Sequence, residues 1–176
     1  RLLGDGTKAT LNGIAQGYAA DRALAALRTH DVQHALIDTG ELAALGDKGD
    51  TGGESAWTVG LQHPRQPESY MALTRLKDRC LSTSGDYATT FSPDRRFHHV
   101  FDPATGQSPG ELASVSVAAP TAMQADAWST ALFVLGARRA VDILRGLPDH
   151  DALFVLKDGR TLATPGFPLA EEGAAS

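Results

Sequence analysis

Apolar and polar residues alternate along this chain with two different periods, and each period predicts a different kind of element. In residues 12–30 the apolar side chains recur at roughly helical spacing, as at Ile14, Leu24 and Leu27. This pattern predicts a helix, and Asn12 has the side chain of a typical N-cap residue. Two further helices are predicted at residues 121–136 and 137–147. Gly136 lies between them, and a residue without a Cβ is well suited to end the first.

Strands are predicted where residues alternate in polarity, or where a short β-prone run is bounded by Gly or Pro. The expected strands lie at residues 1–11, 33–40, 41–45, 57–64, 70–78, 80–85, 95–103 and 113–120, with a Pro-rich turn between the fourth and fifth. A hairpin is predicted at residues 151–165, because Asp158-Gly159 is a strong hairpin-turn signal.

The order of these elements predicts the fold class. Strands follow one another in adjacent pairs, and the helices are grouped toward the two ends of the chain. We therefore expect an α+β fold with a mainly antiparallel sheet packed against helices. No segment has the composition of a linker, so residues 1–176 are expected to form a single domain.

Composition narrows the possible partners. Lys and Arg number 16 against 21 for Asp and Glu, and no basic stripe could follow a phosphate backbone, so nucleic acid is not expected as a partner. No apolar run approaches the length of a membrane span. The single Cys80 cannot form an internal disulfide. Because the chain begins at Arg1, within a predicted strand, we expect a processed or excised N-terminus.

The predicted helix "ADAWSTALFVLG" carries three oxygen side chains near its beginning. Asp126, Ser129 and Thr130 have the i, i+3, i+4 spacing that places side chains on one face of a helix. Hard oxygens of this kind suit Mg²⁺ or Ca²⁺. The structural alternative is an acid that meets the helix dipole and hydroxyls that bond back to helix carbonyls.

The stretch "HHVFDPATG" holds two neighbouring histidines, which point to opposite faces if the segment is a strand. Only one of His98 and His99 can then serve a given site. Histidine is a common general base at neutral pH, and Asp102 could orient it or assist it. The alternative is a core histidine beside a surface histidine, with "DPATG" as a simple turn.

Two Gly-containing stretches could contact an anion. In "STSGDY", residues 82–87, small residues leave backbone N–H groups open to an anion. In "LNGIAQGYAAD", Gly13 and Gly17 suit either phosphate binding at a helix start or close helix packing, and packing is the simpler interpretation. The stretch "STSGDY" does not match a P-loop, a Rossmann fingerprint or a G-x-S-x-G elbow.

Six stretches in succession resemble the ApbE family of FAD:protein FMN transferases. They are "LNGIAQGYAAD", "ALIDTGELAALG", "WTVGLQHP", "STSGDY", "FHHVFDPATG" and "ADAWSTALFVLG". The resemblance runs from about residue 9 to residue 166 and covers the C-terminal half of the usual family length, so we expect the N-terminal part to be missing. It implies an ApbE-like, T-fold-like domain.

The resemblance also implies an activity. Family members split FAD at its pyrophosphate in an Mg²⁺-dependent reaction, transfer FMN to a Thr or Ser hydroxyl of a target flavoprotein and release AMP. Others hydrolyse FAD to FMN and AMP, and a non-catalytic flavin-binding module is a third possibility. The family is typically exported, which implies a periplasmic or membrane-anchored protein whose targets are redox proteins.

Site residues carry over by position. The resemblance implies a metal held by Asp126, Thr130 and Ser129 with the Gly13 backbone carbonyl, and His99 as the base with Asp102 beside it. The residues implied on the flavin side are Thr10, Gln16, Val100 through its main chain, Ser84, Gly85 and Asp86.

Three positions depart from the family pattern. Thr10 stands where the family commonly has an acid, and Gln16 stands where it has a Lys, so charge is lost at both positions. Glu41 stands where the family often has a second Gly, a change for which the sequence offers no functional interpretation.

Overall fold

The computed structural model describes residue 6, residues 8–49 and residues 55–170. Helices and strands follow one another in mixed order along the chain. They are α1 (Ala15–Arg28), β1 (Ala35–Asp38), β2 (Leu42–Leu45), β3 (Trp57–His63), β4 (Gln66–Leu76), β5 (Cys80–Gly85), β6 (Leu112–Ala119), α2 (Ala122–Leu135), α3 (Ala137–Leu144), β7 (Asp151–Leu156) and β8 (Thr161–Ala163).

A six-stranded sheet organises the fold, with the strand order β1-β2-β5-β6-β7-β8. Every pair of neighbours in it is antiparallel. Strand β6 is buried along its whole length, as expected of a strand covered on both faces. The predicted α+β class with a mainly antiparallel sheet is confirmed.

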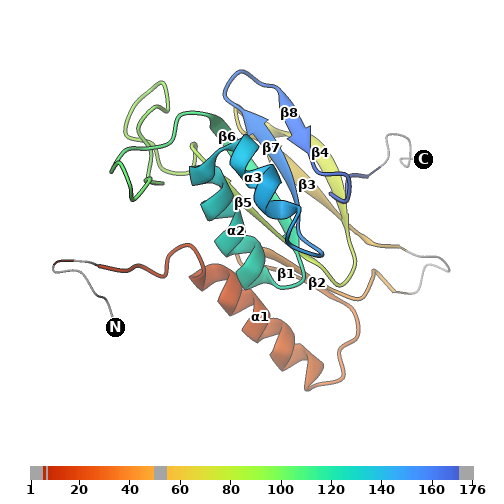
Figure 1. Cartoon of the computed structure of the whole chain (residues 1–176). Helices are drawn as coiled ribbons and strands as arrows, with labels where there is room; N and C mark the ends of the chain where they lie inside the picture. Colours follow the sequence, from red (N-terminus) through yellow and green to blue (C-terminus); the bar gives the residue numbers. More distant parts are fainter. Residues whose placement is uncertain (1–5, 7, 50–54, 171–176) are drawn as a thin grey trace.

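Different elements cover the two faces of this sheet. The three helices lie on one face, and the β3–β4 hairpin lies on the other (Figure 1). The helix-side core includes Leu24, Val117, Leu132 and Phe133, while Leu76 and other apolar residues form a second core under the hairpin. Within the described residues, no helix combines the length and the apolar character needed to cross a bilayer.

Helices α1 and α2 cross at Gly17. A Cβ placed on Gly17 would collide with the backbone of Ala122 and would lie 2.7 Å from the Met123 Cα. The packing interpretation of this glycine is confirmed.

Each of the two helices also caps the other. Gly17 N donates to Asp126 Oδ2 at 3.0 Å. Ala122 N and Met123 N donate to the two Asp21 carboxylate oxygens at 2.8 and 3.0 Å. The first N–H groups of a helix have no partner within the helix, so a carboxylate from a neighbouring helix stabilises them.

Two predictions at the start of the chain are wrong. Helix α1 begins at Ala15, and its N-cap residue is Ile14, whose side chain makes no capping hydrogen bond. Asn12 instead lies in a turn, and its own backbone N–H donates to Thr10 Oγ1 at 3.2 Å. The predicted strand at residues 1–11 is absent at residues 8–11, and residues 1–5 and 7 lie outside the described part.

The predicted strand at residues 95–103 is also wrong. Only single bridges form there, Thr90 with His98 and Asp102 with Gln107, and at His98 a side chain takes the place of a ladder partner. Ser108 Oγ, for instance, accepts from His98 N at 3.0 Å and donates to His98 O at 2.7 Å. The Pro-rich turn is shorter than predicted, since β4 already begins at Gln66.

Candidate functional site

Four hydroxyl side chains from β5 and α2 form a continuous chain of hydrogen bonds, called here the hydroxyl chain: Ser82, Ser84, Ser129 and Thr130. Ser129 Oγ lies 3.0 Å from Ser82 Oγ and 2.8 Å from Ser84 Oγ. Ser84 Oγ lies 3.1 Å from Thr130 Oγ1. Strand alternation brings Ser82 and Ser84 to the face that meets α2. The structure therefore joins "STSGDY" to "ADAWSTALFVLG", two stretches that are far apart in sequence.

Asp126 lies at the same helix start and bridges α1 and α2. Its carboxyl group is buried, which raises its pKa, while the hydrogen bond from Gly17 lowers it. Oδ2 accepts that bond, and Oδ1 has no hydrogen bond to any described residue. Because the Gly17 N–H is used by the carboxylate, the Gly13 carbonyl likewise receives no hydrogen bond from the described residues.

These groups fit a hard divalent cation. Asp126 Oδ1 and the Gly13 carbonyl are oxygens without partners among the described residues. Gly13 lies beside Thr130, so that an added Cβ would be 3.3 Å from Thr130 Oγ1 and would fill the space next to this hydroxyl. The described residues contain no group of three His, Cys, Asp or Glu side chains able to hold a metal. A cation would therefore depend on hydroxyl and backbone oxygens with one carboxylate, a donor set that suits Mg²⁺.

Glu41 is a buried acid that lies next to this cluster and that sequence reasoning did not assign. Its side chain is 7% exposed, and Oε2 has no hydrogen-bond partner. Burial raises the pKa of Glu41 to about 7, the Ser82 hydroxyl lowers it, and the charges of Asp126 and Asp38 raise it further. A carboxyl group with a pKa near 7 is partly protonated at neutral pH, so the extra acid adds less than a full second negative charge beside Asp126.

The two histidines do point in different directions. His98 is fully buried, packs edge to face on the Phe133 ring of α2 and lies 3.1 Å from the Pro109 carbonyl through Nε2. Burial lowers the pKa of His98. His99 is exposed, and its Nδ1 lies 3.1 Å from the Thr89 carbonyl. A carbonyl can only accept, so Nδ1 carries the proton and Nε2 of the neutral ring keeps a lone pair for a proton.

The other predicted residues of the catalytic and flavin side are more scattered. Asp102 Oδ1 accepts from Ala104 N at 2.9 Å within the "DPATG" turn, and no described hydrogen bond joins Asp102 to His99. Gln16 Nε2 donates to Thr39 O at 3.4 Å, across to the β1–β2 turn. Thr10 is exposed, and the Val100 side chain is buried in the helix-side core. Their assigned roles stay predictions.

Asp86 lies in a buried ion-pair network. Its carboxylate is 0% exposed and accepts from both terminal nitrogens of Arg65, at 2.7 and 2.8 Å. Lys157 Nζ lies 3.6 Å from Asp86 Oδ2. Next to it, the Tyr87 ring covers the space where Gly85 would carry a Cβ. The network ties the β3–β4 turn to the ends of β5 and β7, a long-range contact with no local sequence signal.

We expect Asp86→Asn to destabilise the fold by about 2 kcal/mol, because it removes the charge that compensates Arg65. Breaking a fully buried pair costs about 3–5 kcal/mol, and the partial exposure of Arg65 reduces this. Urea unfolding measures the change. Asp142→Asn is the matched control, since its pair with Arg145 is exposed and should contribute less than about 0.5 kcal/mol. Equal effects of the two substitutions would contradict the prediction.

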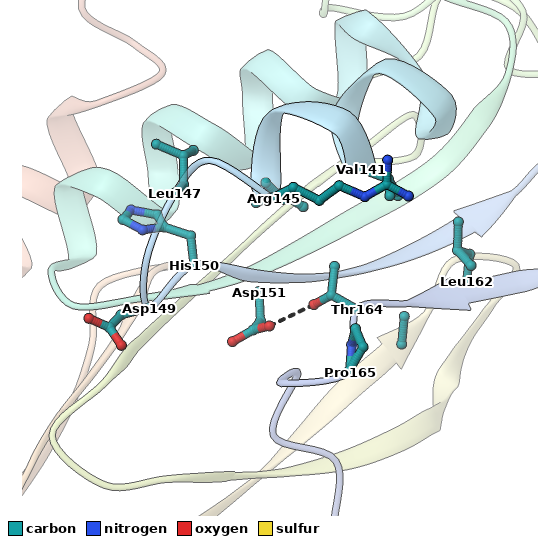
Figure 2. A pocket seen from close by; sticks show the side chains of 11 residues that line it. Val141, Arg145, Leu147, Asp149, His150, Asp151, Leu162, Thr164 and Pro165 are labelled. Atoms are coloured by element: carbon teal, nitrogen blue, oxygen red, sulfur yellow. Dashed lines mark hydrogen bonds between the residues drawn. The ribbon is translucent and has the colours of Figure 1, made fainter.

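Two cavities lie apart from the hydroxyl chain. One of about 490 Å³ lies between α3 and β8, where Leu144 and Leu162 contribute apolar walls and Asp151 is held by Thr164 (Figure 2). The other, of about 340 Å³, lies on the hairpin side and is lined by Gly40 and Thr83 among others. Neither is lined by His99, Asp126 or Thr130.

Comparison with known proteins gives one consistent result. The model of the ApbE family matches residues 1–154. The FAD:protein FMN transferase of Treponema pallidum is 38% identical over 175 residues, which cover 94% of this chain and 48% of that protein. An FAD:protein FMN transferase of Klebsiella pneumoniae is 36% identical over 156 residues, 87% of this chain and 47% of that protein.

Solved structures agree with the fold. The crystal structure of the ApbE protein of Thermotoga maritima superposes with a TM-score of 0.82 at 32% identity, over 92% of this chain and 52% of that one. The apo form of the Pseudomonas stutzeri flavinyl transferase ApbE gives a TM-score of 0.71 at 36% identity, over 88% and 48%. The chain spans about half the length of the curated relatives it matches.

Proposed function

We propose, on the premise that this chain belongs to the ApbE family, that it acts in FAD:protein FMN transfer. The proposed reaction moves FMN from FAD to a Thr or Ser hydroxyl of a target flavoprotein and releases AMP. The observation that supports it best is that α2 brings Asp126 to Gly17 and Thr130 to Gly13, while Asp126 Oδ1 and the Gly13 carbonyl have no partners among the described residues.

Mg²⁺ is the proposed cation, held by Asp126, Thr130 and Gly13. When bound, it would supply neutralisation of negative charge on the diphosphate. Ser129 Oγ bonds Ser84 Oγ and the Asp126 backbone carbonyl, so its proposed part is to hold Thr130 and Asp126 in place through the hydroxyl chain.

In the proposed chemistry, the acceptor hydroxyl oxygen forms a bond to the FMN-side phosphorus. The bond from that phosphorus to the bridging oxygen breaks, and AMP leaves with the bridging oxygen. His99 Nε2 takes the hydroxyl proton, which its tautomer allows because Nδ1 is held by Thr89. The same proposal includes redox proteins outside the cytoplasm as the targets. It also includes a periplasmic or membrane-anchored location for this protein.

The test combines the protein with FAD, Mg²⁺ and a target protein that carries the acceptor Thr. Mass spectrometry should find the target heavier by one FMN, with one AMP released per target. Free FMN and AMP without a modified target would instead indicate an FAD pyrophosphatase. Bound FAD without any turnover would indicate a non-catalytic flavin-binding module and would reject the proposal.

We expect His99→Ala to slow AMP release by about 10²–10⁴-fold, the usual contribution of a general base. FAD affinity should change little, because the reactive nitrogen is proposed to contact the acceptor proton. Initial rates and an FAD titration measure the two quantities. His30→Ala removes an exposed histidine just after α1 and serves as the control. An unchanged rate in His99→Ala would eliminate His99 as the base.

A further inference from the structure

We infer that Ser84 is a positioning residue of the candidate metal site: it accepts the Thr130 proton and thereby leaves the Thr130 Oγ1 lone pairs facing a divalent cation. This inference rests on the proposed function, and it gives Ser84 a role different from the flavin contact that the sequence predicted.

The direction of the chain is fixed at Ser129. Ser129 Oγ lies 3.0 Å from the Asp126 backbone carbonyl, which can only accept, so Ser129 is the donor in that bond. A hydroxyl has one proton and two lone pairs. Ser129 Oγ also contacts Ser82 and Ser84, and it has no proton left for Ser84, so Ser84 is the donor in the bond between them.

The remaining protons follow from this. Ser84 uses its single proton on Ser129, so in the 3.1 Å contact with Thr130 it can only accept. Thr130 must donate to Ser84, and no proton remains on Thr130 Oγ1 that could face a cation. A hydroxyl that binds a metal needs this arrangement, because the lone pair must point to the metal and the proton away from it.

The space beside the Thr130 hydroxyl is also open. Gly13 carries no side chain there, and the Gly13 carbonyl and Asp126 Oδ1 both lack partners among the described residues. All three oxygens thus offer lone pairs without competing protons. Of these three oxygens, only Thr130 Oγ1 belongs to a hydroxyl group. Ser84 accepts the proton of that hydroxyl and so leaves its lone pairs free for the cation.

The experiment measures Mn²⁺ binding by electron paramagnetic resonance, in the absence of FAD, for the parent chain and for Ser84 variants. Ser84→Ala is expected to weaken Mn²⁺ binding by about 10–100-fold, the usual effect of removing a group that orients a metal ligand. Ser84→Thr and Ser84→Val have the same shape, so Thr should keep affinity near that of the parent chain while Val loses it. Thermal unfolding checks that each variant is folded.

Ser116→Ala is the matched control. Ser116 lies on β6, next to β5, and its hydroxyl bonds Thr83 Oγ1 at 2.8 Å on the face turned away from α2. The Ser116→Ala variant should therefore have the Mn²⁺ affinity of the parent chain. If the parent chain binds Mn²⁺ and Ser84→Val binds it equally well, the role of Ser84 is overturned and the metal site stands. If the parent chain binds no Mn²⁺, both the metal site and this inference are overturned.

Discussion

An Asp126→Asn variant is expected to fold like the parent chain and to lose more than about 100-fold in divalent-cation affinity. Loss of an orienting group around a metal site costs about 10–100-fold, and removal of the one carboxylate ligand should cost more. The amide has the shape of the carboxyl group, so its oxygen can still accept from Gly17 N. An amide is also cheaper to bury than a charged carboxylate, and burial is the main influence on the pKa of this side chain.

The measurement pairs Mn²⁺ titration with urea unfolding. Asp126→Ala is the informative comparison, because it loses the cap of α1 as well as the charge and should cost about 1–2 kcal/mol of stability. FMN transfer should be lost in both variants. An Asp126→Asn protein with parental Mn²⁺ affinity would show that Asp126 has only the structural role of capping a helix.

Gly17→Ala is expected to destabilise the fold by about 3 kcal/mol or more, at the upper end of the range for overpacked interiors. The added methyl group meets the backbone of Ala122 and Met123, which cannot rotate away as a flexible side chain would. Separating the helices would also stretch the bond from Gly17 N to Asp126. The substitution should therefore reduce cation affinity and stability together, as measured by urea unfolding and Mn²⁺ titration.

Gly146→Ala provides the control for the loss of a glycine. Gly146 is exposed, and an added Cβ would lie 3.5 Å from the Ile143 carbonyl, an ordinary contact. Its effect should be neutral or stabilising by up to about 1 kcal/mol, because alanine restricts the unfolded chain. If Gly17→Ala were as stable as Gly146→Ala, the close helix crossing would be refuted.

Local patterns predicted most of the sheet but failed where side chains replace backbone pairing. The turn at Asp158-Gly159 and the C-cap at Gly136 are as predicted, with φ of +90° and +78°. Both depend on a local backbone conformation that a glycine signals. The segment around His98 is predicted as a strand because its residues are β-prone, yet the Ser108 hydroxyl from a neighbouring loop bonds both backbone groups of His98. Such a contact has no signal in the segment itself.

The candidate site was predictable only where it depends on local spacing within one helix. Helical spacing placed Asp126, Ser129 and Thr130 on one face, and the structure joins Ser129 and Thr130 through Ser84. The spacing contained no information about β5, which supplies that link. The burial of Glu41 and the pairing of Asp86 with Arg65 also come from tertiary packing. The base assignment of His99 came from the family resemblance and stays a prediction.

The reciprocal capping of α1 and α2 makes the two helices a single unit of local opening. If α1 unfolds, the N–H groups of Ala122 and Met123 lose Asp21, and if α2 unfolds, Gly17 loses Asp126. Amide hydrogen exchange at the starts of both helices should therefore proceed through one shared opening with one free energy. A cation held at Asp126 would slow exchange in α2 at Ala122 as well as in α1 at Gly17, so occupancy of the site would be detectable at amides that do not touch it.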